Sequence, residues 1–343
     1  MKVLVTGGAG FIGFHVAKAL LERGDSVVVV DNLNDYYSVD LKKDRLKQIE
    51  NKVTFYNVDI ADFDAMQKIF QAHQFDKICH LAAQAGVRYS IINPFIYHKT
   101  NNLGTLNILE LMRLNNVKDI VLASSSSVYG GNEKVPFSVI DQVDKPISLY
   151  AATKKHTEHM AHVYHNLYGI NCFILRFFTV YGPWGRPDMA LFKFTKAMLE
   201  NKPIEVYNHG HHERDFTFIT DIVAGVVASL DKVKGYEILN LGNNNPVHLN
   251  HFIGCIEKEL GKTAQRQHLP LQQGDVPSTY ADIEKTKQVL GWEPKVKIEE
   301  GIHQFIDWYK DYHNITPASF TNETLTNETL PKNVNNGNII NGN

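Results

Sequence analysis

The sequence predicts an α/β protein with a doubly wound parallel sheet and a smaller mixed α/β lobe. Two observations carry this prediction. Short apolar runs alternate with helical patterns from residue 2 to about residue 177, which is typical of a parallel sheet covered by helices on both faces. A glycine-rich turn follows the first apolar run, at a junction where the pattern changes from strand to helix.

The individual elements follow from apolar periodicity, taken in chain order. Residues 2–6 form a short β-branched run, and apolar residues then recur at helical spacing over residues 11–23. The further predicted strands are residues 26–30, 53–58, 76–81, 119–123 and 172–177. The further predicted helices are residues 41–49, 62–73 with Asp62 as N-cap, 94–114 and 150–168.

The chain divides into three parts where the alternation of predicted strands and helices changes and where the composition changes. Residues 1–180 are predicted to form the first domain, with a segment at about residues 236–250 returning to its sheet. Residues 181–313 begin with the Pro/Gly-rich loop YGPWGRP and are predicted to form most of the smaller, substrate-binding lobe. Residues 314–343 are rich in Asn and Thr and lack apolar periodicity, so we expect a disordered tail.

Composition and charge exclude several classes of function. Hydrophobic residues make up 43% of the 343 residues and charged residues 21%, with a formal net charge of −2 at pH 7. This balance offers no positive field for nucleic acid, and no apolar run is long enough to span a membrane. The three cysteines match no metal-ligand spacing, so we expect free thiols in the cytoplasm. His209, His211 and His212 lack a carboxylate at ligand spacing, so no metal site is predicted.

The glycine-rich turn predicts a dinucleotide site. Gly7, Gly10 and Gly13 form G-x-x-G-x-x-G, which lets the backbone approach a pyrophosphate at a helix N-terminus. Asp31 can accept hydrogen bonds from both ribose hydroxyls, while Asn32 stands where a 2′-phosphate would need a basic residue. We therefore predict a Rossmann-type domain that binds NAD rather than NADP. The remaining predicted cofactor contacts are Phe11, Ile12, Asp59, Ile60, Leu81, Ala82, Ala83, Gln84, Asn101, Ser124, Tyr150 and Lys154.

A serine run and a Tyr/Lys pair supply candidate catalytic groups. Ser124 to Ser127 follow the fifth strand at its carboxyl end, where open parallel sheets bind ligands. Tyr150 and Lys154 are four residues apart and so lie on one face of a helix. An ammonium group and a nicotinamide cation beside a phenol lower the pKa of that phenol, which makes Tyr150 the candidate base. A Tyr/Lys pair at this spacing is common on helices, but its position after the glycine turn and the serine run makes it a strong indication of catalytic function.

Residues 1–313 resemble the extended short-chain dehydrogenase/reductase family, and within it the UDP-glucuronate 4-epimerases. The resemblance rests on DNLNDYY, HLAAQAGVRYS, SLYAATKK, RDFTFITDI and GDVPSTYAD. It implies that Tyr150 is the base, that Lys154 binds the nicotinamide ribose, and that Ser125, or else Ser127, supplies the catalytic hydroxyl. It further implies a tightly bound NAD, a role in polysaccharide biosynthesis and a homodimer joined through the helices over residues 94–114 and 150–168. The substrate-binding residues that it implies are Arg88, Ser127, Thr179, Arg186, Arg214 and Asp275.

The serine run also separates the possible reactions of this family. Related dehydratases carry an Asp-Glu pair just before V-Y-G and related decarboxylases a Glu, whereas this chain has Ser126-Ser127. We therefore expect C4 epimerisation of UDP-glucuronate to UDP-galacturonate through a 4-keto intermediate. The alternatives are a 4-epimerase of neutral UDP-sugars (UDP-glucose or UDP-GlcNAc), a UDP-glucuronate decarboxylase and a non-catalytic NAD-bound protein. Hydrogen bonds from the serine run, Thr179 or Arg186 to the substrate carboxylate would disfavour loss of carbon dioxide.

Overall fold

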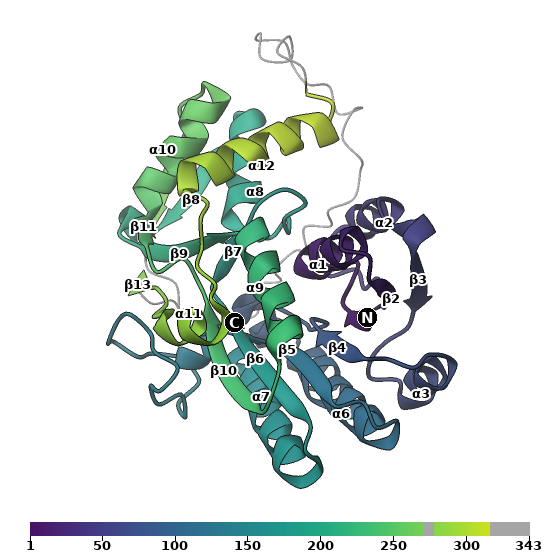
Figure 1. Ribbon diagram of the computed structural model, residues 1–343. Coiled ribbons are helices and arrows are strands. Elements are labelled where there is room, and N and C mark those ends of the chain that lie inside the picture. Colours follow the sequence, from purple (N-terminus) through teal and green to yellow (C-terminus); the bar gives the residue numbers. More distant parts are fainter. Residues whose placement is uncertain (271–277, 316–343) are drawn as a thin grey trace.

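The computed structural model describes residues 1–270 and 278–315, which form a larger and a smaller lobe (Figure 1). The predicted parallel sheet is confirmed: seven parallel strands lie in the order β10-β6-β5-β4-β1-β2-β3. The strands are β1 (Lys2–Thr6), β2 (Ser26–Asp31), β3 (Val53–Asn57), β4 (Lys77–His80), β5 (Asp119–Ser125), β6 (Asn171–Phe177) and β10 (Tyr236–Leu241). The direction of winding reverses between β1 and β4, which creates a crevice at their carboxyl ends.

Helices cover both faces of this sheet. On one face α1 (Phe11–Glu22) and α9 (Ile219–Lys232) pack against each other, and their buried side chains belong to one apolar core. On the other face α3 (Phe63–Ala72), α6 (Gly104–Leu114) and α7 (Leu149–Tyr168) contribute to a second core. The central strands β1 and β2 therefore bury side chains on both sides, as their β-branched composition predicts.

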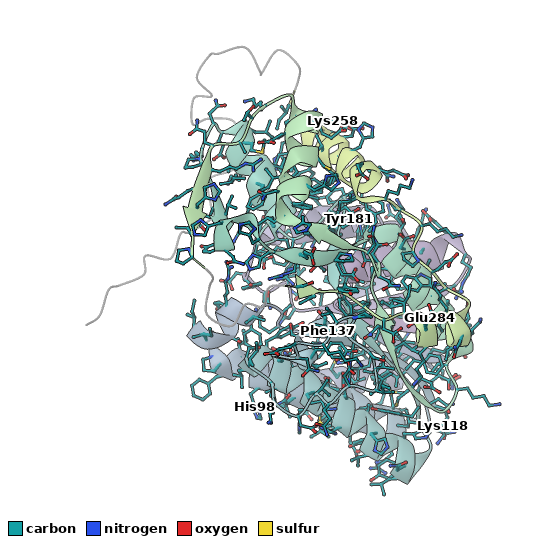
Figure 2. All side chains as sticks on the ribbon, turned by 90° about the vertical axis from the view of Figure 1, so that its left-hand side faces the viewer. His98, Lys118, Phe137, Tyr181, Lys258 and Glu284 are labelled. Atoms are coloured by element: carbon teal, nitrogen blue, oxygen red, sulfur yellow. The ribbon has the colours of Figure 1, made fainter. Side chains whose placement is uncertain are left out.

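The smaller lobe is built from segments after β6. A four-stranded sheet contains β7 (Thr179–Tyr181), β9 (Glu213–Phe218), β11 (Pro246–His248) and β13 (Ser278–Thr279), and β8 (Ile204–Tyr207) pairs with β12 (Arg266–Leu269). Helices α8 (Ala190–Leu199), α10 (Leu249–Leu260) and α12 (Ile298–Tyr312) complete the lobe, and α11 (Glu284–Leu290) packs on α9 and β10. In Figure 2, Lys258 marks the far end of this lobe and Lys118 the opposite end of the larger one.

The helix predicted over residues 94–114 has a more complex course. It consists of α5 (Pro94–Tyr97), a π-helix (η2, His98–Leu103) and α6. A short helix, α4 (Val87–Ile92), precedes it and was not predicted. The π-helix widens the turn that carries Asn101, whose amide bonds the backbone of Gln84 and the Thr153 hydroxyl. Apolar periodicity alone does not reveal this insertion.

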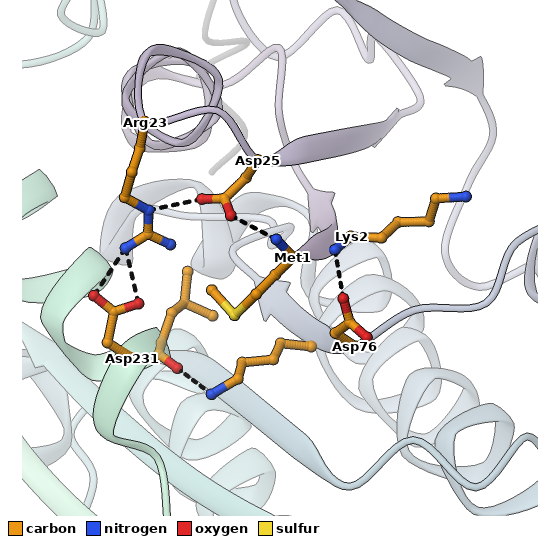
Figure 3. A network of polar contacts seen from close by, with 8 residues as sticks. Met1, Lys2, Arg23, Asp25, Asp76 and Asp231 are labelled. Carbon is orange, nitrogen blue, oxygen red and sulfur yellow. Dashed lines mark hydrogen bonds and ion pairs between the residues drawn. The ribbon is translucent and has the colours of Figure 1, made fainter.

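The amino-terminal edge of the sheet is held by a charged network (Figure 3). The amino group of Met1 contacts Asp25 at 2.8 Å, and Arg23 joins Asp25 to Asp231 of α9. The backbone N–H of Lys2 also donates to Asp76. The network links β1, the α1–β2 turn and α9 at the edge opposite the crevice. Among the described residues, no helix is long and apolar enough to cross a membrane.

Candidate active site

A cavity of about 980 Å³ lies at the carboxyl ends of the central strands, between the two lobes. Its size suits a dinucleotide together with a second ligand. The predicted residues that line it are Gly7, Gly10, Phe11, Ile12, Gly13, Asp31, Asn32, Ile60, Leu81, Ala82, Ala83, Gln84, Arg88, Ser124, Ser125, Ser127, Tyr150, Lys154, Thr179 and Arg186. Asp59, Asn101 and Arg214 are not part of its lining. Asp275 and residues 316–343 lie outside the described residues.

The glycine turn is fixed by close backbone approaches. Gly7 has a φ of +73°, and a Cβ on it would lie 2.7 Å from the backbone nitrogen of Ala82. A Cβ on Gly13 would lie 2.1 Å from the carbonyl oxygen of Gly7. Only glycine fits these two positions. The turn leads directly into α1, whose first residues, Phe11, Ile12 and Gly13, line the cavity.

Asp31 sits where the cofactor ribose is predicted. Its carboxylate accepts hydrogen bonds from the N–H groups of Ala9 and Leu33, at 3.1 and 2.9 Å. A second group here was not predicted: Lys42 of α2 (Val39–Lys47) is only 4% exposed and donates twice to Asn34. Burial lowers the pKa of Lys42, and the charge of Asp31 opposes this change. A lysine on the buried side of a short polar helix is a weak sequence signal, which is why it was missed.

Asp59 and Asn101 support the cavity from outside its lining. The Asp59 carboxylate pairs with Lys99 at 2.9 Å and accepts from the N–H of Ala61. Asn101 bonds both the N–H and the carbonyl of Gln84, at 2.8 and 3.0 Å. Asn101 thereby shapes the loop after β4 on which Gln84 lies.

The candidate catalytic groups converge at the end of β5. Lys154 donates to the carbonyl oxygen of Ala123 at 2.8 Å, and Ser125 donates to the Ser127 hydroxyl at 3.2 Å. Burial lowers the pKa of Lys154 to about 8. Burial also raises the pKa of Tyr150, while a hydrogen bond with Ser125 and the charge of Arg186 oppose that rise. Of the two candidate serines, Ser125 is therefore the one that influences the pKa of the phenol.

Ser124 points in a different direction from its neighbours. Its hydroxyl donates to the carboxylate of Glu158 at 2.6 Å, inside the protein. Glu158 was not predicted, although it stands four residues after Lys154. The sequence signal that could have found it is the continued four-residue spacing from Tyr150 through Lys154.

Arg186 lies on the loop after β7, lines the cavity and forms an ion pair with Asp188. Its Nε donates to Asp188 Oδ1 at 3.0 Å and its Nη2 to Oδ2 at 2.5 Å. The Tyr36 hydroxyl donates to the same carboxylate, and burial together with Asp188 raises the pKa of Tyr36 to about 12. Tyr36 belongs to the DNLNDYY stretch far from Arg186 in sequence, so this contact was not predicted. The ring of Tyr97 lies 6.0 Å from that of Tyr150, behind the cavity lining.

Two other arginines lie further toward the smaller lobe. Arg88 of α4 stacks over the ring of Tyr207 at 5.2 Å, and both line the cavity. Arg214 of β9 donates to the carbonyl of Glu213. The next residue, Asp215, is fully buried and accepts from the N–H groups of Asn243 and Ala281.

Among the described residues, the histidines at 209, 211 and 212 do not belong to a group of three or more possible metal ligands. A different surface group does bring three possible ligands together, His251 and Cys255 of α10 with Glu299 of α12. His251 and Glu299 share a hydrogen bond of 2.9 Å there. This group lies outside the cavity lining.

Comparison with known proteins gives the chain a family. The model of the GDP-mannose 4,6 dehydratase family matches residues 4–305. The chain belongs to this family of extended short-chain dehydrogenases/reductases. The predicted resemblance is confirmed, and the most informative relatives in this family are NAD-dependent UDP-sugar 4-epimerases.

Three members illustrate the similarity. The UDP-glucuronate 4-epimerase of Thermodesulfobacterium geofontis is 48% identical over 311 residues, covering 90% of this chain and 96% of that protein. The UDP-glucuronic acid 4-epimerase of Bacillus cereus, solved with UDP-glucuronic acid and NAD, is 36% identical with a TM-score of 0.84, covering 91% of this chain and 100% of that one. The UDP-glucose 4-epimerase of Thermotoga maritima, solved with UDP-glucose, is 32% identical with a TM-score of 0.85, covering 91% and 99%.

Proposed function

We propose that the protein interconverts UDP-glucuronate and UDP-galacturonate by NAD-dependent epimerisation at C4. The observation that carries this proposal is that Tyr150, Ser125 and the buried Lys154 line one cavity, in which the serine run has no carboxylate. These groups can move one proton, and the run offers no further acid or base for elimination of water.

The residues present fit NAD. A dinucleotide pyrophosphate is accommodated by the backbone of the Gly7–Gly13 turn, where side chains are excluded. Asp31 lies at the end of β2 and is 9% exposed, in position to accept from ribose hydroxyls. When bound, NAD supplies a hydride acceptor for C4 that returns the hydride within the same turnover. It therefore acts as a prosthetic group and is not consumed.

The chain's own groups handle the proton. The Tyr150 phenolate takes the proton of the C4 hydroxyl as the C4–H bond gives up its hydride, which leaves a 4-keto sugar. Lys154 stabilises the phenolate by its charge, and Ser125 holds the C4 oxygen by a hydrogen bond. After the sugar turns over in the cavity, the hydride returns to the opposite face and Tyr150 gives the proton back to the C4 oxygen. The sugar therefore regains the proton and the hydride that it lost, with the configuration at C4 inverted.

The substrate carboxylate requires its own partners, because a 4-keto glucuronate is a β-keto acid that can lose carbon dioxide. We place this carboxylate among Ser127, Thr179 and Arg186, which line the same cavity. Hydrogen bonds that keep the carboxylate near the plane of the ketone disfavour breaking of the carbon–carbon bond. If substitution of Ser127 and Thr179 leaves the ratio of UDP-pentose to epimer unchanged, this assignment is wrong.

UDP-glucose is the second candidate substrate, because a relative of the same fold binds it. Arg186 favours the glucuronate: Asp188 holds its Nε and Nη2, and its remaining N–H groups can donate a charge-assisted hydrogen bond to a carboxylate, which a neutral hydroxymethyl group cannot accept. The test is to incubate the purified protein with UDP-glucuronate, UDP-glucose or UDP-GlcNAc, without added cofactor, and to follow the products by NMR. UDP-galacturonate supports the proposal, UDP-pentose would make the protein a decarboxylase, and conversion of the neutral sugars alone would select the second candidate.

We further propose a homodimer in the cytoplasm, where the buried cysteines remain thiols. Helices α4, α5, α6 and α7 pack beside one another, and they expose large apolar side chains such as Ile92 at 75%, Phe95 at 83% and Leu167 at 66%. Such exposure on neighbouring helices is typical of an interface. Sedimentation should show a dimer that Phe95→Lys converts to a monomer; a monomeric wild type would contradict this proposal.

A further inference from the structure

Helix α7 carries a third charged group behind the two candidate catalytic residues. Tyr150, Lys154 and Glu158 follow one another at four-residue intervals, so they lie on one face of the helix. Tyr150 and Lys154 line the cavity, whereas Glu158 does not. Glu158 is only 1% exposed. A carboxylate buried this deeply requires strong partners to remain charged.

The partners of Glu158 keep it ionised. Arg176 of β6 donates to both carboxylate oxygens, Nε and Nη2 each at 2.9 Å, and Ser124 of β5 donates at 2.6 Å. Burial alone would raise the pKa of Glu158, but Arg176 and Ser124 lower it below its usual range. Glu158 thus places a permanent negative charge one helical turn behind Lys154.

Lys154 has few other groups to stabilise its ammonium charge. Its side chain is 4% exposed, and its one described hydrogen bond is to the Ala123 carbonyl. Burial lowers its pKa, and the charge of Glu158 is the influence that opposes this. Without Glu158, Lys154 would lose its proton more readily.

The other titratable groups around the pair do not replace this charge. His80 of β4 is buried and its pKa is lowered to about 3 by burial and by the charge of Lys154, so it is neutral. Tyr97 of α5 faces Tyr150 and is a neutral phenol, because burial raises its pKa. Arg186, Arg176 and Lys155 are cations. Arg186 acts on Tyr150, whereas Arg176 and Lys155 contact the Glu158 carboxylate, Lys155 at 3.5 Å. Glu158 is therefore the anion that acts on Lys154 from within the described residues.

We propose that Glu158 is a positioning residue for the reaction, which keeps the proton on Lys154 while Tyr150 is the deprotonated member of the pair. This inference rests on the proposed roles of Tyr150 and Lys154. When the pair has lost one proton, that proton remains either on the amine, giving ammonium and phenolate, or on the phenol, giving amine and phenol. Only the first form removes the proton of the C4 hydroxyl. Because Glu158 lies closer to Lys154 than to Tyr150 along α7, its negative charge favours the reactive form.

The same contacts also fix the strand that carries the site. Arg176 lies opposite Ser124 in the β5–β6 register, and Glu158 joins the two side chains. The two neighbours of Ser124 belong to the site: the carbonyl of Ala123 accepts from Lys154, and Ser125 lines the cavity together with Tyr150. One buried carboxylate thus connects the helix and both strands behind the reacting groups.

The test is the pH profile of kcat for Glu158→Gln, which keeps the shape of the side chain and removes its charge. The profile should have an acidic and an alkaline limb, which report the loss of the first and the second proton from the Tyr150/Lys154 pair. Removal of a negative charge makes both losses easier, so both limbs should move to lower pH, the alkaline limb by about one pH unit. The maximal kcat should fall by about tenfold. If the pKa of Lys154 falls by one unit relative to that of Tyr150, the ratio of the ammonium–phenolate form to the amine–phenol form falls tenfold. KM and bound NAD should stay unchanged, because Glu158 does not line the cavity.

Matched variants separate charge from packing. Glu158→Asp retains the carboxylate and should keep both limbs at their wild-type positions. Glu257→Gln is the control, since Glu257 also pairs with an arginine, Arg266, but lies on α10 outside the cavity; it should leave the profile unchanged. If Glu158→Gln does not fold because Arg176 is left unpaired, Glu158→Gln/Arg176→Met removes both buried charges. Because the cation is lost together with the anion, both limbs should move in the same direction as in Glu158→Gln but by less.

Two outcomes have distinct meanings. If Tyr150→Phe is inactive and the Glu158 variants keep wild-type limbs, or lose kcat without any shift, Glu158 has only a structural role and the inference is overturned. If Tyr150→Phe retains wild-type activity, the proposed function itself fails.

Discussion

The two sides of the cavity are built in different ways. On the cofactor side, the glycine turn, the strand ends and α1 shape the site with backbone atoms, and side chains are excluded by approaches as close as 2.1 Å. On the substrate side, side chains from distant segments form the wall, as with Tyr36, Arg186 and Asp188. The first kind of site tolerates almost no change in shape, whereas the second tolerates change in shape and depends on charge.

Gly13→Ala should have the largest effect. The added Cβ would lie 2.1 Å from the Gly7 carbonyl, so the turn must open and NAD should no longer co-purify with the protein. We expect complete loss of activity, measured together with bound NAD by absorbance. Gly254→Ala is the matched control, because a Cβ there meets nothing within 4 Å in α10. It should stabilise the helix by up to about 1 kcal/mol. If Gly13→Ala still co-purified with NAD, the claim that the cofactor side tolerates no added side-chain atom would be wrong.

Tyr150→Phe should have the next largest effect. The substitution removes the proton acceptor and keeps the ring that packs 6.0 Å from Tyr97. We expect kcat to fall roughly 10²- to 10⁴-fold with bound NAD retained. Steady-state kinetics and cofactor content measure the two quantities separately. A parallel loss of NAD would mean that the phenol holds the cofactor rather than the proton.

Asp188→Asn should act on the substrate side alone. Arg186 would lose the charge of the carboxylate that orients its guanidinium. Because the guanidinium is then no longer held in one orientation, we expect KM for UDP-glucuronate to rise about tenfold, which corresponds to about 1.4 kcal/mol of binding free energy, with NAD content unchanged. Asp44→Asn serves as the control, since Asp44 pairs with Lys47 and accepts from Tyr312 outside the cavity. An unchanged KM would show that Asp188 does not position Arg186.

Arg23→Gln should have the smallest effect. Arg23 joins Asp25 and Asp231 at the sheet edge opposite the cavity and is partly exposed (Figure 3). Solvent screening limits such pairs to about 1 kcal/mol or less of unfolding free energy. Urea unfolding should detect this loss while kcat and KM stay at wild-type values. A change in kinetics would mean that the network acts on the cavity.

The difference between the two sides of the cavity also explains which features could be predicted from the sequence and which could not. The alternating pattern, the glycine turn and Asp31 are local signals, and the sheet and the cavity contacts of that side follow from them. Tyr150 and Lys154 are likewise local, because four-residue spacing places them on one helix face. Lys42, Asp188 and Glu158 act through partners that are distant in sequence or on other elements, so no single segment reveals them. The π-helix at His98–Leu103 was missed because its sequence, HKTNNL, contains only one large apolar residue and so gives no periodic signal.

The central claim is that the C4 hydride leaves the sugar and returns to it within one turnover. The most direct measurement uses UDP-glucuronate deuterated at C4, incubated with the purified protein without added cofactor, and NMR of the product. The account predicts UDP-galacturonate that keeps its deuterium at C4. Protium at C4 of the product, or UDP-pentose in place of the epimer, would contradict it.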